Sequence, residues 1–536
     1  MWSMEKKRLQ VWFPLLFSII MVAGMVIGYK LREQSGIKNF FTINKKTSFQ
    51  EVIDLIRLKY VDEVGIDSLS KGAINNLLHH LDPHSVFIPA SDLSYINDDL
   101  RGNFSGIGIE FQMFYDTVNV INVLPGGPSE RAGLQAGDKF LKVNDSISIA
   151  GKHLQPNDIR RLLRGANGSI VKLTVMRDRH IIPVNVSRGT IAVPSVDASY
   201  MITPATGFIH INKFAESTYR EFMVALENLQ AQHMQKLILD LRGNGGGFLG
   251  VAVNIADEFL DGNKLIVYTQ GSHVRKYEYK CKRDGLFEKG DLVLLVDEGS
   301  ASASEVLGGA LQDWDRATIV GRRTFGKGLV QEQFELSDGS ALRLTVARYY
   351  SPLGRNIQKP YTEGYDKYEE EITGRFHSGE VLKGDTTKKS GPAFRTPKGR
   401  IVYGGGGITP DIYVSFDTAS MGRETLKLYM KGTLSNFIYS YFIQHKQQFN
   451  EYKKTADFAT FKAGENEWNA LKKFAARDSV DLDKIGVKDK SAIIKRIPAM
   501  LARQLWRYEG YYEVMNQSDD FVQKALQVLK EKSIEK

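Results

Sequence analysis

An uncharged apolar run opens the chain over residues 11–28, and Lys6, Lys7 and Arg8 precede it. As a helix at 1.5 Å per residue, this run spans roughly 27 Å, close to the thickness of a bilayer's hydrocarbon core. No small-residue cleavage site follows, so the pattern favours an uncleaved signal anchor over a cleaved signal peptide. We therefore expect a cytoplasmic basic flank (1–10), a transmembrane anchor (11–28) and a linker (29–48).

The next segment, residues 49–100, has apolar positions at helical spacing over 49–60 and again over 69–81. We expect a small helical region here. His79, His80 and His84 lie close together, but their spacing fits no zinc site and no cysteine or carboxylate completes a ligand set. These histidines are better explained as surface or packing residues, and we expect no metal site.

Between residues 101 and 190 the pattern changes to short apolar runs that are separated by glycine-rich turns. Gly106, Ile107, Gly108 and Ile109 alternate small and apolar side chains, and turns followed by short elements come at 125–134 and 137–144. Such a texture is typical of a small β-rich domain.

Strands and helices then alternate over residues 191–418, which indicates an α/β domain. The strands are expected at 207–211 and 237–241 and the helices at 218–232 and 251–260. A charged, glycine-rich stretch at about 361–404 interrupts this pattern and is expected to be an inserted or mobile loop.

The remaining residues, 419–536, carry apolar stripes at helical spacing and predict a helical region. The stripes are Leu434, Phe437, Ile438, Tyr441 and Phe442, then Ile493, Ile494, Ile497, Leu501 and Leu505. Two uses remain open for them. The helices either pack on the rest of the protein, or form a dimer contact or a platform for substrate.

Composition limits the classes of function. A chain of 536 residues is long enough for three or four modules. The net charge of +9 suits an anionic membrane surface, and no zinc-ligand cluster, RNA-binding signature or arginine-rich tract supports nucleic-acid binding. With Cys281 as the single cysteine, an internal disulfide is impossible.

Candidate chemistry lies in two segments of the α/β region. Ser300, Ser302 and Ser304 follow an apolar strand and open a helix, where unused N–H groups can face a developing oxyanion. Lys327 stands in a glycine-bracketed loop, where burial can remove its proton and make it a general base. Gln331 follows by four residues, so in a strand the two share a face.

The ordinary roles of these residue types are different, because most such serines cap helices and most lysines are solvated. No histidine lies between His273 and His377 to act as the usual partner of a serine. From the residues alone, the choice among the three serines stays open.

A glycine run, residues 242–247, follows the strand at 237–241. It lacks both the Walker ending and the dinucleotide-binding spacing, so we expect no nucleotide cofactor and no other cofactor. Its better use is to bring a backbone N–H close to a reacting carbonyl, where a Cβ would intrude.

Taken together, these motifs resemble the C-terminal processing peptidases, also called tail-specific proteases, over roughly residues 49–415. The segments that carry the resemblance are 60–62, 81–85, 106–110, 239–247, 299–305, 310–317, 320–331 and 349–355. The resemblance implies a multidomain α/β protein with a ClpP/crotonase-like protease core (191–418). It also implies an inserted PDZ domain (101–190), between helical N- and C-terminal appendages.

The resemblance also implies roles for single residues. Ser302 would be the nucleophile, Lys327 its base and Gln331 the residue that orients the lysine. The oxyanion donors would be the N–H groups of Ala303 and of Gly246 or Gly247. The loop of Gly106, Ile107, Gly108 and Ile109 would hold the terminal carboxylate of a protein or peptide substrate.

The expected protein is thus a serine endopeptidase of the bacterial cell envelope, single-pass in the inner membrane, with its catalytic part on the periplasmic side. Its expected partners are polypeptides with accessible C-terminal tails, and a homodimer or an adaptor protein is a further candidate. A lysine base predicts activity at neutral to alkaline pH. Two rival hypotheses are an inert PDZ scaffold and an adaptor that delivers substrates to another protease.

Overall fold

The computed structural model describes residues 3–34, 47–114, 116–383, 391–415, 422–458 and 460–534. The chain divides into two compact units, residues 1–74 and 75–536. Helices α1 (Ser3–Gln34) and α2 (Ser48–Lys59) belong to the first unit, and α3 (Ile66–His79) runs across the division. The membrane span expected at 11–28 is not confirmed: within the described residues, no helix combines the length and the apolar character that a membrane crossing needs.

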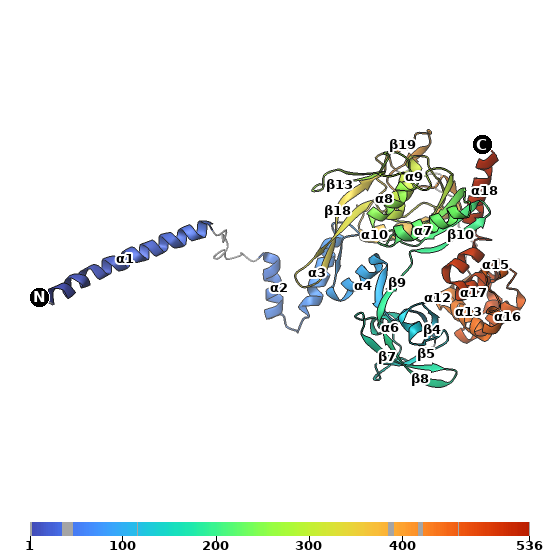
Figure 1. The fold of residues 1–536 in the computed structure, drawn as a ribbon, viewed down its shortest axis with the longest axis horizontal. Coiled ribbons are helices and arrows are strands. Elements are labelled where there is room, and N and C mark those ends of the chain that lie inside the picture. Colours follow the sequence, from blue (N-terminus) through green and yellow to red (C-terminus); the bar gives the residue numbers. More distant parts are fainter. Residues whose placement is uncertain are drawn as a thin grey trace. The chain divides into compact units, whose positions relative to one another are not determined.

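A six-stranded sheet forms the centre of the second unit, in the order β10-β11-β12-β15-β16-β21 (Figure 1). All neighbours are parallel except β10 and β11, as the alternation of strands and helices predicts. The strands are β10 (Val196–Thr203), β11 (Thr206–Ile211), β12 (Lys236–Asp240), β15 (Asp291–Val296), β16 (Thr318–Gly321) and β21 (Ile412–Tyr413).

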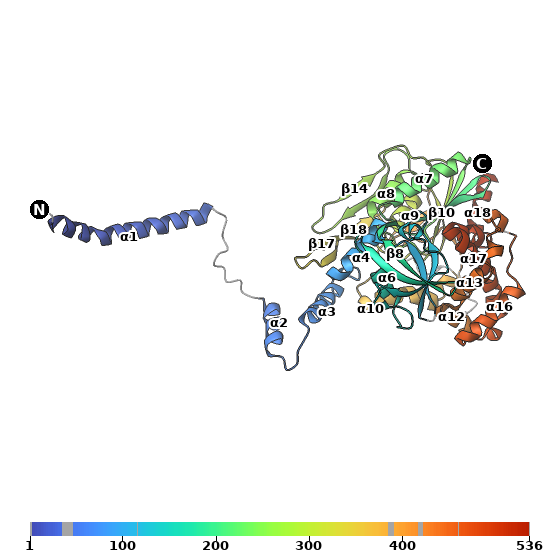
Figure 2. The same cartoon turned by 60° about the horizontal axis from the view of Figure 1, so that its bottom comes forward.

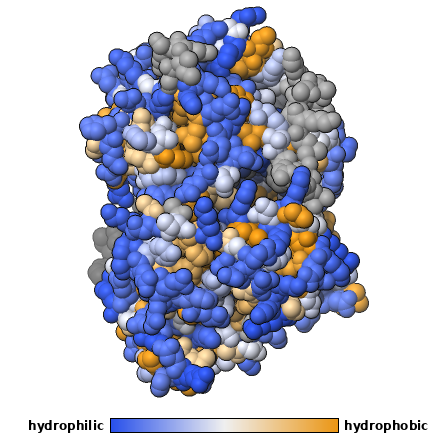
Figure 3. All heavy atoms as spheres, turned by 90° about the vertical axis from the view of Figure 1, so that its right-hand side faces the viewer, coloured by the Kyte–Doolittle hydropathy of each residue, from blue (hydrophilic) through white to orange (hydrophobic). Residues whose placement is uncertain are grey.

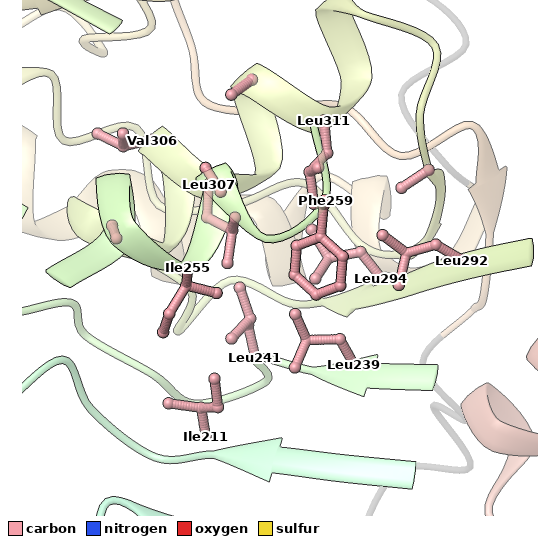
Figure 4. Close-up of a cluster of buried hydrophobic side chains, with 14 of the residues drawn as sticks. Ile211, Leu239, Leu241, Ile255, Phe259, Leu292, Leu294, Val306, Leu307 and Leu311 are labelled. Carbon is pink, nitrogen blue, oxygen red and sulfur yellow. The ribbon is translucent and has the colours of Figure 1, made fainter. Parts of the chain in front are cut away.

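Alternate residues of these strands bury apolar side chains on both faces of the sheet. On one face, Leu239 and Leu294 pack against α7 (Thr218–Ala231), α8 (Leu249–Asp257) and α9 (Ala303–Asp313), and Figure 4 shows this cluster closely packed. On the other face, Ile238 and Val293 pack against the last helix, α18 (Asp520–Ile534). The α/β core is therefore three-layered; the finer prediction of a ClpP/crotonase-like core stays a prediction.

A second sheet carries the segment that follows Lys327. Its order is β1-β18-β13-β14, and β17 pairs antiparallel with β18. Strand β1 comes from the segment before the β-rich module, and both β1 and β17 pair with β18. Residues near 85 therefore lie in the same sheet as Gln331 on β17. The strands are β1 (Val86–Ile88), β13 (Leu265–Gln270), β14 (Tyr277–Lys280), β17 (Leu329–Glu335) and β18 (Ala341–Tyr350).

The β-rich module has its own apolar core and lies between α4 (Ala90–Arg101) and the central sheet in sequence. A ribbon of β2 (Asn103–Gly106) and β9 (Gly189–Ala192) leads into and out of it. Its strands are β3 (Ile109–Phe114), β4 (Thr117–Val123), β5 (Lys139–Val143), β6 (Ile147–Ser148), β7 (Ile170–Arg177) and β8 (His180–Ser187). Its helices are α5 (Pro128–Arg131) and α6 (Pro156–Leu163), the latter lying beside the sheet in Figures 1 and 2.

The charged stretch expected to be a loop differs from that prediction. It contains α10 (Tyr365–His377), α11 (Glu380–Lys383) and a hairpin of β19 (Ala393–Arg395) and β20 (Ile401–Tyr403); residues 384–390 lie outside the described residues. The reason is that its charges pair with each other and with the core: Glu371 pairs with Arg375 of the same helix and with Arg323, and Glu380 also pairs with Arg323.

The C-terminal region is helical, as predicted, and its two apolar stripes pack against each other in one core. The stripes are therefore buried, and the face in Figure 3 is mostly hydrophilic with small separate hydrophobic patches. The helices are α12 (Arg423–Met430), α13 (Thr433–Gln444), α14 (Lys446–Phe449), α15 (Thr455–Phe458), α16 (Glu465–Ala475), α17 (Val487–Met515) and α18.

Candidate active site

The three serines around the start of α9, Ser300, Ser302 and Ser304, have different surroundings. The Ser300 hydroxyl is buried and donates to the carbonyl of Leu241 (2.8 Å). The Ser304 hydroxyl is also buried and donates to the carbonyl of Asn244 (2.9 Å). Ser302 is only partly buried, and its hydroxyl makes no capping hydrogen bond to the helix. Two of the three hydroxyls thus serve the fold, which leaves Ser302 as the candidate nucleophile.

The backbone of Ser302 is strained. Its φ of 55° and ψ of −111° place a non-glycine residue outside the favoured regions, at the first turn of α9. Such strain persists only where the surroundings enforce it, and it clusters at functional sites. Here the Ser302 N–H donates to Glu305 Oε2 (2.9 Å), and the Tyr349 hydroxyl lies 3.1 Å from the Ser302 carbonyl oxygen. These two contacts hold the strained turn in place.

Lys327 is partly buried, and its Nζ donates to Gln331 Oε1 (2.9 Å). Burial lowers the pKa of this lysine, and the positive charge of Arg343 lowers it further, while Glu305 and Asp82 oppose the shift. A lowered pKa increases the fraction of neutral amine at a given pH, which is what a general base needs. The hydrogen bonds of the described residues include none between Ser302 Oγ and Lys327 Nζ, whose bond goes to Gln331.

The orientation of Gln331 is set by the segment that precedes β1. Its Nε2 donates to the carbonyl oxygen of His84, so its Oε1 is the atom that faces Lys327. That segment is itself fixed by Asp82, whose carboxylate accepts from the N–H of His84 (2.8 Å) and of Ser85 (2.9 Å). Chain segments nearly 250 residues apart therefore meet at the lysine.

The Ser302 and Lys327 segments are fastened to the same two side chains. Buried Glu305 accepts hydrogen bonds from the N–H groups of Ser302 (2.9 Å), Gly326 (2.7 Å) and Lys327 (2.8 Å). Burial raises the pKa of Glu305 to about 7, although these donors favour its charged form. The Tyr349 hydroxyl also lies between the carbonyl oxygens of Ser302 and Lys327. Glu305 and Tyr349 thus fix the distance between the two segments.

The glycine run contacts the candidate nucleophile directly. A Cβ on Gly246 would lie 2.8 Å from Ser302 Cβ and 2.9 Å from the Ala303 nitrogen, and its φ of 98° also favours glycine. The Gly246 N–H donates to Asn244 Oδ1 (2.9 Å), so it is already engaged. Of the two glycines expected to be oxyanion donors, Gly247 is therefore the better candidate beside Ala303, the first residue of α9.

Helix α10 holds the loop that carries Lys327. Buried Arg375 donates to the carbonyl oxygens of Arg323 (3.0 Å), Thr324 (2.9 Å) and Phe325 (3.2 Å) and to Glu371. The Tyr368 hydroxyl lies 2.7 Å from Nε2 of His84. Burial lowers the pKa of His84 to about 3, so its imidazole is neutral at physiological pH.

The loop expected to hold a substrate's terminal carboxylate precedes β3. The carbonyl oxygens of Ile107 and Gly108 accept from the N–H groups of Ser129 (3.0 Å) and Leu124 (3.1 Å), so both oxygens are engaged inside the module. Ile109 lines a cavity beside β3. The loop thus lies at the start of a strand whose next residues, Glu110, Phe111 and Gln112, line the same cavity.

Sequence reasoning missed Glu305, Tyr349, His84, Tyr368 and Arg375. Glu305 ends the serine segment and His84 lies in the segment 81–85. Both segments carry the family resemblance, but the residue type alone indicates no role for either side chain. Their roles depend on contacts between distant segments, which a single sequence does not reveal.

Three family models match the chain. Peptidase family S41 matches residues 205–364, a PDZ domain matches 120–177, and a family of unknown function, DUF8443, matches 425–507. A carboxy-terminal-processing protease of Bartonella bacilliformis is 32% identical over 380 residues, which cover 67% of this chain and 85% of that protein. A probable CtpA-like serine protease of Staphylococcus epidermidis is 33% identical over 390 residues, 70% of this chain and 77% of that protein.

Solved structures match as well. The photosystem II D1 C-terminal processing protease is 27% identical, covers 69% of this chain and 87% of its own, and has a TM-score of 0.36. The α/β core, the PDZ domain and the sequence matches define a serine peptidase. The chain belongs to the carboxy-terminal-processing proteases of peptidase family S41.

Proposed function

We propose that the protein cleaves peptide bonds through an acyl-enzyme in which Ser302 is the nucleophile and Lys327 the general base. One observation carries this proposal: of the three described serines around the start of α9, Ser302 alone has an uncommitted hydroxyl, and Glu305 fixes its turn to the Lys327 loop. Gln331, held by His84, orients the lysine amine.

In the proposed mechanism, Ser302 Oγ attacks the scissile carbonyl carbon while neutral Lys327 Nζ takes the hydroxyl proton. The N–H groups of Ala303 and Gly247 stabilise the oxyanion. Lys327 then gives its proton to the nitrogen of the leaving amine as the C–N bond breaks, and an ester on Ser302 remains. Water, deprotonated by Lys327, attacks this ester and releases a product with a new C-terminus.

The PDZ domain is proposed to select the substrate by its C-terminal tail. The tail would add as a strand to β3, with its carboxylate at residues 106–109. The carbonyl oxygens of Ile107 and Gly108 are engaged inside the domain. This conformation of the loop supports the placement, because no free carbonyl oxygen of these two residues would repel the carboxylate.

A bacterial envelope location is also proposed, with residues 11–28 as the anchor in the inner membrane and the catalytic part outside. The apolar run, its basic flank and the bacterial origin of the relatives support it. Extraction of cell membranes at alkaline pH tests it: an anchored protein stays with the membranes, whereas release would contradict the anchor. Light scattering in detergent tests the expected homodimer.

The activity is tested by incubating the purified full-length chain with an unfolded protein that ends in an apolar tail. Cleavage that disappears in Ser302→Ala but persists in Ser300→Ala is the expected result. Binding without cleavage would support the inert scaffold, and cleavage only after a second protease is added would support the adaptor.

A further inference from the structure

A cavity of about 900 Å³ lies away from the candidate catalytic residues, beside the PDZ domain. Strand β3 lines one side through Ile109, Glu110, Phe111 and Gln112, and helix α6 contributes Arg160. The opposite wall comes from α17 in the C-terminal region, including Arg503 and Arg507. Figures 1 and 2 both show the C-terminal helices beside the PDZ strands.

Strand β3 is an edge strand of its sheet, because β4 is its one neighbour among the described strands. An edge strand has unpaired backbone groups that can pair with an extended peptide. The cavity therefore lies where a substrate tail would add to the PDZ sheet. Its volume lies within the range of ligand pockets.

The wall facing β3 is formed by a bend in α17. Trp506 and Arg507 have non-helical backbone angles inside this long helix, with φ at 58° for Arg507. The bend presents Arg507 Nη2 to Glu110 Oε1 at 3.0 Å, and Arg503 Nη2 lies 3.6 Å from Glu110 Oε2. Both arginines are more than one-third exposed, so a ligand can reach them.

The rest of β3 is also held by the C-terminal region. Gln112 Nε2 donates to Asn436 Oδ1 of α13 (2.7 Å), and the rings of Phe114 and Tyr439 stack at 4.9 Å. The Tyr439 hydroxyl donates to the carbonyl oxygen of Val120 on β4 (3.2 Å). These contacts keep α13 and α17 against the face of β3 that carries Glu110, Gln112 and Phe114.

The charge of this wall is unbalanced. Two guanidinium groups share the single carboxylate of Glu110, so one positive charge is left beside the groove. The cavity's other charged lining residues are Arg160, Asp197, Lys213, Arg242 and Glu509. Of these, Arg242 is paired with Asp240 and Asp519, Lys213 with Asp99, and Asp197 with His210.

We propose that the C-terminal helical region forms the second wall of the tail-binding groove. In this role, Arg503 and Arg507 are specificity-determining residues that bind a carboxylate of the substrate tail. This carboxylate of the substrate replaces that of Glu110 as the partner of the two guanidinium groups. It is either the terminal α-carboxylate of the tail or the side chain of an Asp or Glu in the tail. This inference rests on the proposed tail recognition by the PDZ domain.

Peptide binding to the full-length Ser302→Ala protein in detergent tests the proposal by fluorescence anisotropy. Three probes share an apolar tail: one has a free C-terminus and one Asp, the second has Asn in place of that Asp, and the third is amidated at the C-terminus. The double change Arg503→Gln and Arg507→Gln should weaken binding of the first peptide about 5-fold. If the peptide with Asn binds both proteins equally, the carboxylate comes from the Asp side chain. If the amidated peptide binds both proteins equally, it is the terminal carboxylate.

Two further variants separate recognition from a structural role. Glu110→Gln removes the competing carboxylate, so the first peptide should bind more tightly, whereas loss of a merely structural ion pair would weaken binding or leave it unchanged. Lys488→Gln, an exposed change on the same helix, should have no effect. Unchanged binding in the double arginine variant, or weaker or unchanged binding in Glu110→Gln, would overturn the proposal.

Cleavage by the chain with Ser302 intact distinguishes failure of the groove proposal from failure of the proposed function. If the parent cleaves the unfolded substrate and the arginine variants bind every peptide normally, the groove proposal is wrong and the proposed function stands. If the parent neither cleaves nor binds any of the three peptides, both are wrong.

Discussion

At the scale of single residues, the surroundings of Lys327 determine how the proposed dyad responds to pH. Burial and Arg343 lower the pKa of the lysine, whereas Glu305 and Asp82 raise it. The neutral amine predominates above the pKa, so activity rises with pH through the pKa of Lys327. Each neighbouring charge should therefore move the pH profile in a direction that its sign dictates.

Arg343→Gln is the sharpest test of this electrostatic balance. Removing the positive charge raises the pKa of Lys327, so the rise of kcat/KM should move to higher pH and activity at pH 7 should fall. Arg343→Lys keeps the charge and serves as the control. A profile that moves to lower pH in Arg343→Gln would contradict the assignment of Lys327 as the base.

Gln331 offers a second test at this scale. Gln331→Ala removes the acceptor that orients Lys327 Nζ, and kcat should fall about 10²-fold with little change in KM. Gln331→Glu keeps an acceptor and adds a negative charge that raises the pKa of Lys327, so its profile should move to higher pH. Equal profiles for the wild type and Gln331→Glu would count against the contact.

The sequence pointed to the two segments of this site but did not by itself distinguish a candidate nucleophile among the serines. Ser300, Ser302 and Ser304 are equivalent in type and setting, and only the resemblance favoured Ser302. The structure supplies an independent reason, because the carbonyls of Leu241 and Asn244 engage the other two hydroxyls. One carbonyl lies just after β12 and the other lies in the glycine run that follows, and their proximity to the serines is a product of folding.

At the scale of elements, α10 shows why composition misleads. Its charged, glycine-rich surroundings predicted an inserted or mobile loop, yet Arg375 is 3% exposed and donates to three carbonyl oxygens of the Lys327 loop. Buried charges are tolerated when they are paired and hydrogen-bonded, and Glu371 supplies the pairing. The strand expected at 237–241 forms as β12 (Lys236–Asp240), because the short apolar run from Leu237 to Leu239 is buried on both faces of the sheet.

Arg375→Met tests whether α10 positions the catalytic loop. Loss of the buried guanidinium leaves carbonyl groups and Glu371 without a donor, so the free energy of unfolding should fall by about 3 kcal/mol. The activity of the folded variant should fall as well, because the Lys327 loop loses its support. Lys367→Met, an exposed change on the same helix, should alter neither melting temperature nor activity. Full activity in folded Arg375→Met would exclude this role for α10.

At the scale of the whole molecule, the end of the chain completes the protease core. Helix α18 covers the face of the central sheet opposite α9, and Arg242, at the start of the glycine run, bonds to Asp519 just before that helix. The sequence predicted a helical C-terminal region but not this return to the sheet. An apolar stripe indicates that one face of a helix is buried, but it does not indicate which element of the protein covers that face.

Leu529→Ala tests how much the core depends on α18. The side chain is buried against the sheet, so its truncation should lower the free energy of unfolding by about 2–4 kcal/mol. Lys530→Ala changes an exposed neighbour and should have almost no effect. Denaturant unfolding measures both, and equal stability of the two variants would show that α18 is not part of the cooperative core.

The central claim is that Ser302 is acylated with Lys327 as its base, and covalent trapping tests it most directly. The wild-type protein is treated with a serine-reactive fluorophosphonate, and peptide mass spectrometry locates the adduct. We predict modification at Ser302 and not at Ser300 or Ser304, and labelling at least about 10²-fold slower in Lys327→Ala. An adduct on either neighbouring serine, or undiminished labelling of Ser302 in Lys327→Ala, would contradict the claim.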